Sequence, residues 1–239
     1  MTFRKPERVA ADLAQICKLR PTVRDIVLTQ DSYTRKHLKA TAHAIERLGC
    51  RVPYNLMFRA EPWVSKEIGQ LLATSGCTDV FIGAEALDDE ILEVLGKGIN
   101  AQGAVSAIKT LAEYVNVTIG MILFVPGISS DALVRQREAL GDILPYVEAI
   151  EPEVLTVVNG SGFAADPQRF GIVLNAKERV LNDSWCFGLS HDIPWAMADQ
   201  KLGEAWVVHN THMEEMCREY VNARYWRSMG EVGENFIST

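Results

Sequence analysis

Apolar residues recur along this chain with two alternating spacings. In five segments they lie three or four positions apart, which is the spacing of an amphipathic helix. Between these segments lie short runs rich in β-branched and aromatic residues, which are typical of buried parallel strands. The strands are predicted at about residues 25–30, 53–59, 79–84, 117–124 and 154–159. The helices are predicted around Val9–Cys17, Leu38–Leu48, Ile68–Leu72, Ile91–Leu95 and Ala104–Leu111.

The alternation of helix and strand predicts an α/β fold. Parallel strands need crossover connections, and we expect these to be right-handed, with the helices on the outer face of the sheet. Periodicity alone does not decide between an open sheet and a barrel. After the fifth predicted strand the pattern weakens into an aromatic-rich tail, which ends in a predicted helix around 211–227. No repeat or flexible linker occurs, so we expect a core of residues 1–175 with residues 176–239 packed on it as an extension.

Composition narrows the class of protein. The chain has 239 residues, of which 48% are hydrophobic and 23% charged, enough to bury a sizeable core as one unit. Its net charge of −7 and the lack of a Lys/Arg cluster argue against a nucleic-acid-binding surface. No apolar run reaches the length of a membrane span, and the charged N-terminus lacks the apolar region of a signal peptide. We therefore expect a cytoplasmic protein that acts on a small molecule.

The cysteines predict no metal site in this chain. They number five and are too widely separated to form a local CxxC or CxxxCxxC ligand set. An odd number also argues against a disulfide framework. Cys17, Cys50 and Cys77 lie beside apolar residues, so we interpret them as small buried hydrophobic side chains.

Several segments together resemble the radical S-adenosylmethionine (SAM) superfamily, closest to its cobalamin-dependent type. Gly76–Glu85 and Asp88–Gly98 are similar to the family's "G-C-x-x-V-x-x-G-x-E-S" and "I-L-x-x-L-x-K-G" motifs. Val117–Gly127 resembles its "G-x-x-x-G-x-P-G" element, with Phe124 where glycine is usual. The remaining matching segments are Arg4–Val9, Asp25–Asp31, Pro53–Glu61 and Phe163–Ile172, in the family's order along the chain.

This resemblance implies a partial TIM-like (β/α) barrel with a C-terminal helical and aromatic extension. It also implies an enzyme that binds SAM, and a [4Fe–4S] cluster is expected for the family. The CxxxCxxC loop that would hold the cluster is not in this sequence. Because Met1 falls just past the place of that loop, we expect a further N-terminal domain or a partner subunit to supply it, with cobalamin possible in a missing domain. The alternative is a cluster-free, non-radical descendant that acts as a binding or scaffold module.

Candidate SAM-binding residues lie where the predicted strands end, since barrel chemistry gathers at that edge. By resemblance, Asp31 receives the SAM amino group, or it caps the following helix instead. Arg59 can bind a carboxylate, or it forms a salt bridge with Glu61 or Glu85. Glu85 can accept ribose hydroxyls or pair with Arg59, and Gly83 leaves room for close approach.

The next two strands add weaker candidates. Ile122 belongs to an apolar edge for the adenine, or to a core strand that ends in a Pro-Gly turn. Asn159 can contact ribose or substrate, or it is only a turn former. His209 and His212 are three residues apart but have no third ligand nearby in the sequence, so a metal site is not favoured. Cys186 and His191 are likewise not favoured as a nucleophile and base, because spacing alone does not activate a thiol. The catalytic residues stay unknown at this stage.

Overall fold

The computed structural model describes most of the chain up to residue 175 and parts of the remainder. The described residues are 3–23, 25–29, 33–48, 53–153, 155–175, 180–181, 191–193, 195–201, 203–204, 207–209, 211–213, 215–216 and 218. The predictions at Asp31, Cys50, Cys186 and Cys217, and most of the predicted C-terminal helix, lie outside these residues. None of the described helices is long and apolar enough to cross a membrane.

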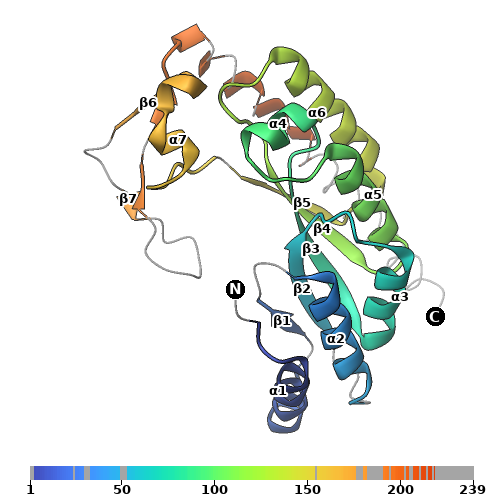
Figure 1. Cartoon of the computed structure of the whole chain (residues 1–239). Coiled ribbons are helices and arrows are strands. Elements are labelled where there is room, and N and C mark those ends of the chain that lie inside the picture. Colours follow the sequence, from blue (N-terminus) through green and yellow to red (C-terminus); the bar gives the residue numbers. More distant parts are fainter. Residues whose placement is uncertain are drawn as a thin grey trace, which may run out of the picture.

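A five-stranded parallel sheet forms the centre of the molecule (Figure 1). Its order is β1-β2-β3-β4-β5, so each strand pairs with the next one in the sequence. The strands are β1 (Ile26–Leu28), β2 (Tyr54–Arg59), β3 (Cys77–Glu85), β4 (Asn116–Ile122) and β5 (Ala149–Glu153). The α/β prediction and its first four strands are confirmed. Within the described residues the sheet is open, with β1 and β5 at its edges, which fits a partial barrel.

Helices pack against one face of this sheet (Figure 1). Along β2, Tyr54, Leu56 and Phe58 are buried toward the helices, whereas the residues between them are half-buried on the opposite face. This alternation follows from the two-residue period of a strand. The helices are α1 (Pro6–Leu19), α2 (Arg35–Glu46), α3 (Lys66–Ser75), α5 (Ala101–Ala112) and α6 (Ser130–Ile143), which is followed by the 3-10 turn η1 (Leu144–Tyr146).

The fifth strand was predicted in the wrong place. The apolar run 154–159 suggested a buried strand, but β5 lies just before it at Ala149–Glu153. This segment contains Pro152 and two glutamates, which disfavour a central strand; an edge strand tolerates them. The apolar run instead supplies Leu155 and Val157 to a second hydrophobic cluster. The end of the strand therefore falls at Glu153 rather than at Asn159.

The second hydrophobic cluster lies beyond the carboxyl ends of the strands. It joins α4 (Asp89–Val94), the loop after β4, α7 (Gly162–Ala165) and the 3-10 turn η2 (Pro167–Phe170). Two short antiparallel pairs complete this part of the fold. They are β6 (Ile172–Leu174) with β9 (Trp195–Met197), and β7 (Val180–Leu181) with β8 (His191–Asp192).

Two cysteines fall within the described residues. Cys77 begins β3 and is 4% exposed, as predicted for a small buried side chain. Burial raises the pKa of its thiol to about 12, so it carries no thiolate at neutral pH. Cys17, near the end of α1, is half-buried.

Candidate functional site

Polar side chains meet where β2 and β3 end. Arg59 ends β2 and lies opposite Gly83 of β3 in the register. Its guanidinium donates a hydrogen bond to the backbone oxygen of Lys97, and Nη1 lies 3.8 Å from Oε1 of Glu61. The predicted alternative for Arg59, a salt bridge within the chain, is therefore formed with Glu61 and not with Glu85.

Glu85 occupies an unusual backbone conformation at the end of β3. Its φ is 63°, and among the described residues it is the only non-glycine residue with a positive φ. Such a conformation costs of order 1–3 kcal/mol and is concentrated at functional sites. The Glu85 carboxylate lies over Gly83, where an added Cβ would be 3.1 Å from Oε1. Gly83 thus leaves open space on this face of the strand. The Glu85 side chain occupies that space.

Lys97 is the partner of this carboxylate. Its Nζ lies 3.1 Å from Oε1 of Glu85, and both side chains are mostly buried, 30% and 23% exposed. The end of α4 places the lysine, because Gly96 adopts a φ of 65° and the Lys97 amide bonds to the carbonyl of Leu92 at 3.1 Å. This is the Schellman arrangement, in which glycine takes the left-handed position after a helix. The short helix α4, which is followed by a glycine, therefore places Lys97 beside the end of β3.

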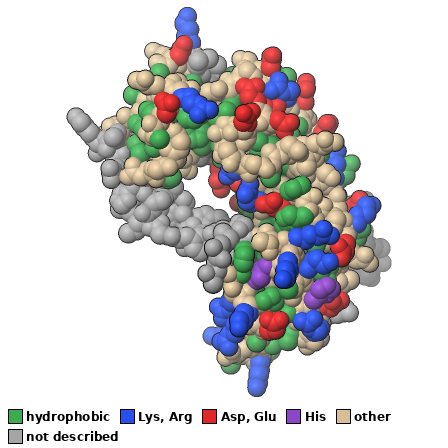
Figure 2. All heavy atoms as spheres, in the orientation of Figure 1, with side chains coloured by type: hydrophobic (Ala, Val, Ile, Leu, Met, Phe, Trp, Pro, Cys, Tyr) green, Lys and Arg blue, Asp and Glu red, His purple; other side chains and the backbone are tan. Residues whose placement is uncertain are grey.

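Glu153 brings a further carboxylate from the end of β5. Its pKa is raised, first by burial and then by repulsion from Glu85 and Glu151, while Lys97 partly offsets the shift. Burial is the main cause of the raised pKa, and the two carboxylates add more to the shift than Lys97 removes. Figure 2 shows acidic and basic side chains gathered at the hollow on the open side of the sheet.

We refer to Arg59, Gly83, Glu85, Lys97 and Glu153 together as the strand-end mouth. A pocket of about 510 Å³ opens beside it and includes Lys97, Ile122 and Glu153 in its lining. Ile122 ends β4, so the predicted apolar edge does reach this site. Asn159 lies in an exposed turn after β5 and does not line the pocket, whereas the neighbouring Ser161 does.

Of the two predicted histidine candidates with described side chains, neither lies with a metal-binding cluster. Burial, followed by repulsion from Arg137, lowers the pKa of His209, and its Nε2 is buried without a partner. Within the described ranges, no group of three or more His, Cys, Asp or Glu side chains is arranged to hold a metal. Those residues therefore do not fit a [4Fe–4S] cluster.

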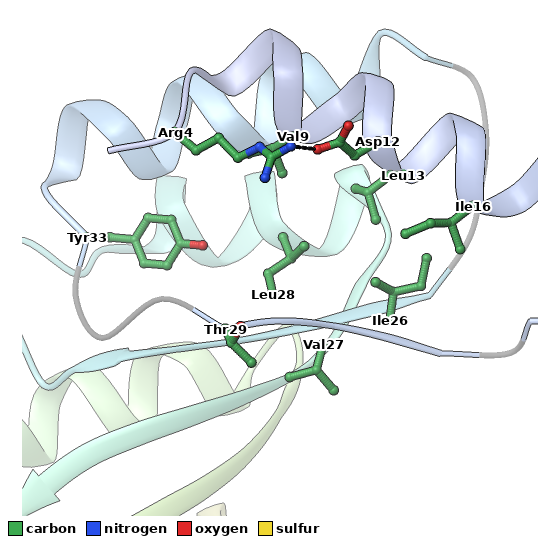
Figure 3. A pocket seen from close by; sticks show the side chains of 10 residues that line it. All are labelled: Arg4, Val9, Asp12, Leu13, Ile16, Ile26, Val27, Leu28, Thr29 and Tyr33. Atoms are coloured by element: carbon green, nitrogen blue, oxygen red, sulfur yellow. Dashed lines mark ion pairs between the residues drawn. The ribbon is translucent and has the colours of Figure 1, made fainter. Parts of the chain in front are cut away.

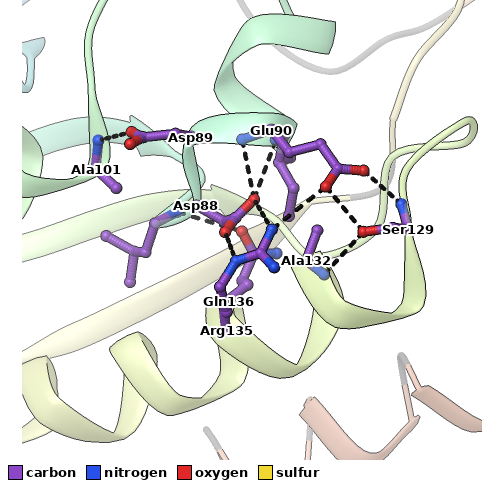
Figure 4. A network of polar contacts seen from close by, with 10 residues as sticks. Asp88, Asp89, Glu90, Ala101, Ser129, Ala132, Arg135 and Gln136 are labelled. Carbon is purple, nitrogen blue, oxygen red and sulfur yellow. Dashed lines mark hydrogen bonds and ion pairs between the residues drawn. The ribbon is translucent and has the colours of Figure 1, made fainter.

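A polar network fixes the loops that carry the mouth (Figure 4). Asp88, 5% exposed, accepts the amides of Glu90 and Ile91 at the start of α4 and binds Nε of Arg135 at 2.7 Å. Glu90 accepts both the amide and the hydroxyl of Ser129, at 2.6 and 2.8 Å. These contacts tie the loop after β3 to the start of α6.

Gln136 connects the loop after β3 and the loop after β4 from a buried position on α6. Its side chain is fully buried, Oε1 accepts the Leu87 amide at 3.2 Å, and Nε2 donates to the Leu123 carbonyl at 3.1 Å. One amide side chain thereby satisfies buried backbone groups just after β3 and just after β4. Gln136 therefore connects the segments that follow Glu85 and Ile122.

We expect Glu153→Gln to stabilise the protein at neutral pH. The ionised carboxyl is disfavoured in the folded state, so its removal should raise the free energy of unfolding by about 0.5 kcal/mol at pH 7. The pKa of Glu153 is higher in the folded state than in the unfolded state. The gain in stability should therefore be absent below the unfolded-state pKa and should grow as the pH rises through the folded-state pKa. Thermal denaturation as a function of pH measures this. Glu138→Gln, exposed on α6, is the control and should show no such pH-dependent gain.

Comparison with known proteins identifies the fold. No family model matches the sequence, and no curated protein matches it. The cobalamin-dependent S-adenosylmethionine radical enzyme OxsB, with aqua-cobalamin bound, aligns with a TM-score of 0.63 at 12% identity, covering 92% of this chain and 37% of its own. The chain has a radical SAM-like fold.

A second structure agrees. The radical S-adenosylmethionine methyltransferase TsrM from Kitasatospora setae, with tryptophan substrate and the SAM analogue aza-SAM bound, aligns with a TM-score of 0.58 at 16% identity. That alignment covers 73% of this chain and 36% of TsrM. The chain thus spans little more than a third of either relative. The resemblance found in the sequence motifs is confirmed at the level of the fold.

Two residues of the mouth were missed by sequence reasoning. Lys97 belongs to the Lys-Gly end of a recognised motif, and its place after a helix-ending glycine was the signal that could have found it. Glu153 was missed because the fifth strand was predicted to end at residue 159, six residues too late. Both errors concern where a chain segment ends rather than which segment it is.

Proposed function

We propose that this chain is the barrel of a radical SAM enzyme and binds SAM at the strand-end mouth. The observation that carries the proposal is the Glu85 carboxylate, which sits on a backbone with positive φ and beside Lys97 at the strand ends of a radical SAM-like fold. Backbone strain of this kind persists where the surrounding structure enforces it, most often at ligand sites.

The chemistry of the mouth is complementary to SAM. The ligand carries an ammonium, a carboxylate and a sulfonium, so it is a zwitterion with one extra positive charge. The ammonium or the ribose hydroxyls can donate to Glu85, and Arg59 and Lys97 can bind the carboxylate. Ile122 offers an apolar surface to the adenine, and Asp31 and Asn159 stay predicted contacts.

The cluster that cleaves SAM by electron transfer is proposed to come from a further N-terminal domain or a partner subunit. We propose that this segment pairs with β1, because β1 forms an edge of the sheet and Val27 is 55% exposed. Between α1 and β1 lies a pocket of about 250 Å³ (Figure 3). Its apolar lining includes Leu13, Ile16 and Leu28, and the ion pair of Arg4 with Asp12 lies above it. An added strand would place its successive side chains alternately on the two faces of the sheet.

Anaerobic reconstitution of this chain alone with iron and sulfide should give no stoichiometric cluster. The five cysteines are widely spaced, and the Cys77 thiol is buried with a raised pKa. Iron content and visible absorbance measure the result. Addition of a polypeptide that carries a CxxxCxxC loop and completes the sheet should restore uptake. Close to four irons bound by this chain alone would contradict the expectation.

Thermal denaturation with added SAM tests the proposed function. A ligand present at about 100 times its Kd stabilises the folded state by roughly 2.7 kcal/mol, so a clear rise in Tm is expected. Adenosine, which shares the base and ribose but lacks the charged groups, should stabilise less. An unchanged Tm at millimolar SAM would favour the alternative, a cluster-free binding or scaffold module.

Radical-based group transfer or rearrangement is the proposed reaction class.

A further inference from the structure

The pocket beside the mouth is large enough for a second ligand. Its volume of about 510 Å³ falls within the range of small-molecule sites. Its apolar walls come from the end of α4, from the segment after β5, and from α7 and η2. The side chains that form them are Val94, Leu95, Leu155, Phe163 and Phe170.

Two aromatic rings form the rigid part of this wall. The ring centroids of Phe163 and Phe170 lie 4.2 Å apart with their planes tilted by 41°. Both residues are less than 10% exposed and belong to the second hydrophobic cluster, so their positions are fixed by packing. A preformed wall of this kind suits a flat apolar group, because little side-chain entropy is lost on binding.

The opening of the pocket is electrostatically unbalanced. Glu153 faces Glu85 of β3, Glu151 of its own strand and Lys97 after α4. Lys97 is already paired with Glu85 at 3.1 Å, and Arg59 is engaged by the Lys97 carbonyl and Glu61. Among the described residues, none forms a hydrogen bond or ion pair with the Glu153 carboxylate, and Glu153 lines the pocket. A cationic ligand group placed there would relieve the repulsion among the carboxylates.

We infer that this pocket binds the second substrate, a small molecule with a ring-sized apolar body and a protonated amine. The amine pairs with the Glu153 carboxylate, and the body contacts Phe163 and Phe170. The hydroxyls of Thr156 and Ser161, which also line the pocket, are available to a polar substituent. The inference rests on the proposed function, in which SAM occupies the adjoining mouth and a co-substrate lies within reach of it.

Three probes of the same shape and different charge test this inference. They are 2-phenylethylamine, 2-phenylethanol and 3-phenylpropionate, titrated into the full chain and followed by ligand-observed NMR. We expect the amine to bind most tightly and the carboxylate least. Glu153→Gln should weaken amine binding about 5- to 10-fold, as expected for a partly exposed charge-assisted contact, and leave the alcohol unchanged. Glu138→Gln removes the same charge on the surface of α6 and should change none of the three.

Phe163→Leu supplies a second readout that does not depend on charge. Leucine preserves most of the buried volume, so the fold should be retained, whereas the flat ring is lost. We expect all three probes to weaken together, in contrast to the charge-selective effect of Glu153→Gln. Equal binding of amine, alcohol and carboxylate, or no binding of any probe at millimolar concentration, would overturn the inference.

Failure of this inference can be distinguished from failure of the proposed function. If SAM raises Tm but no amine preference appears, the pocket assignment alone is wrong. If the amine binds with the predicted selectivity but SAM does not bind, the proposed function fails while the pocket remains a cation site. Displacement of the amine by SAM would show that one ligand fills both spaces, which also overturns the assignment of a second substrate.

Discussion

Gln136→Leu is expected to lower the free energy of unfolding by about 1–3 kcal/mol. Leucine fills a similar volume but leaves the Leu87 amide, whose residue is only 3% exposed, without its partner. The Leu123 carbonyl loses the Gln136 contact but keeps a hydrogen bond with His209, and one unsatisfied buried backbone group costs roughly 1–3 kcal/mol. Urea denaturation followed by circular dichroism measures the change.

Gln102→Leu is the matched control for this substitution. Gln102 is exposed on α5, so the same change of side chain should alter stability by about 0.5 kcal/mol or less. A loss below about 1 kcal/mol in Gln136→Leu would show that water replaces the missing contacts, and that Gln136 does not hold the two loops together.

Glu85→Gln is expected to weaken SAM binding about 10- to 150-fold, with little change in folding. The substitution keeps the size and the backbone position of the side chain but removes the charge that pairs with Lys97 and accepts the ligand. A charge-assisted hydrogen bond is worth roughly 1.5–3 kcal/mol, which corresponds to that range. Isothermal titration calorimetry measures both affinities.

Glu93→Gln controls for the loss of one negative charge near the mouth. Glu93 is exposed on α4 and should leave SAM affinity unchanged. If Glu85→Gln bound SAM as tightly as the wild type, Glu85 would be a structural partner of Lys97 and not a ligand-binding residue.

The helices and strands that follow a simple apolar period were predictable from the sequence. The first four strands and the helices before β4 bury their apolar side chains toward each other, so their periodicity is undisturbed. Helix α6 was not predicted, because Gln136 occupies a core position between Ala132 and Leu140 and interrupts the apolar repeat. The sequence gives no sign that this polar side chain is buried, since its partners are backbone groups 13 and 49 residues away.

The site was only partly predictable for a related reason. A parallel sheet brings the carboxyl ends of its strands together regardless of the conformation of the loops. For this reason the sequence was sufficient to find Arg59, Gly83 and Glu85. Lys97 and Glu153 depend on local geometry: the left-handed turn at Gly96 and the exact end of an edge strand that contains proline. Propensity describes such positions poorly, because tertiary pairing decides them.

Methyl NMR of the isotope-labelled chain during titration with SAM tests the central claim most directly. The account predicts that the Ile122 methyl signals shift as SAM fills the strand-end mouth, while those of Ile26, Val27 and Leu28 at the open β1 edge stay in place. Val173, exposed on β6, serves as an internal reference. Shifts confined to the pocket between α1 and β1, or no shift at any of these positions, would contradict SAM binding at the mouth.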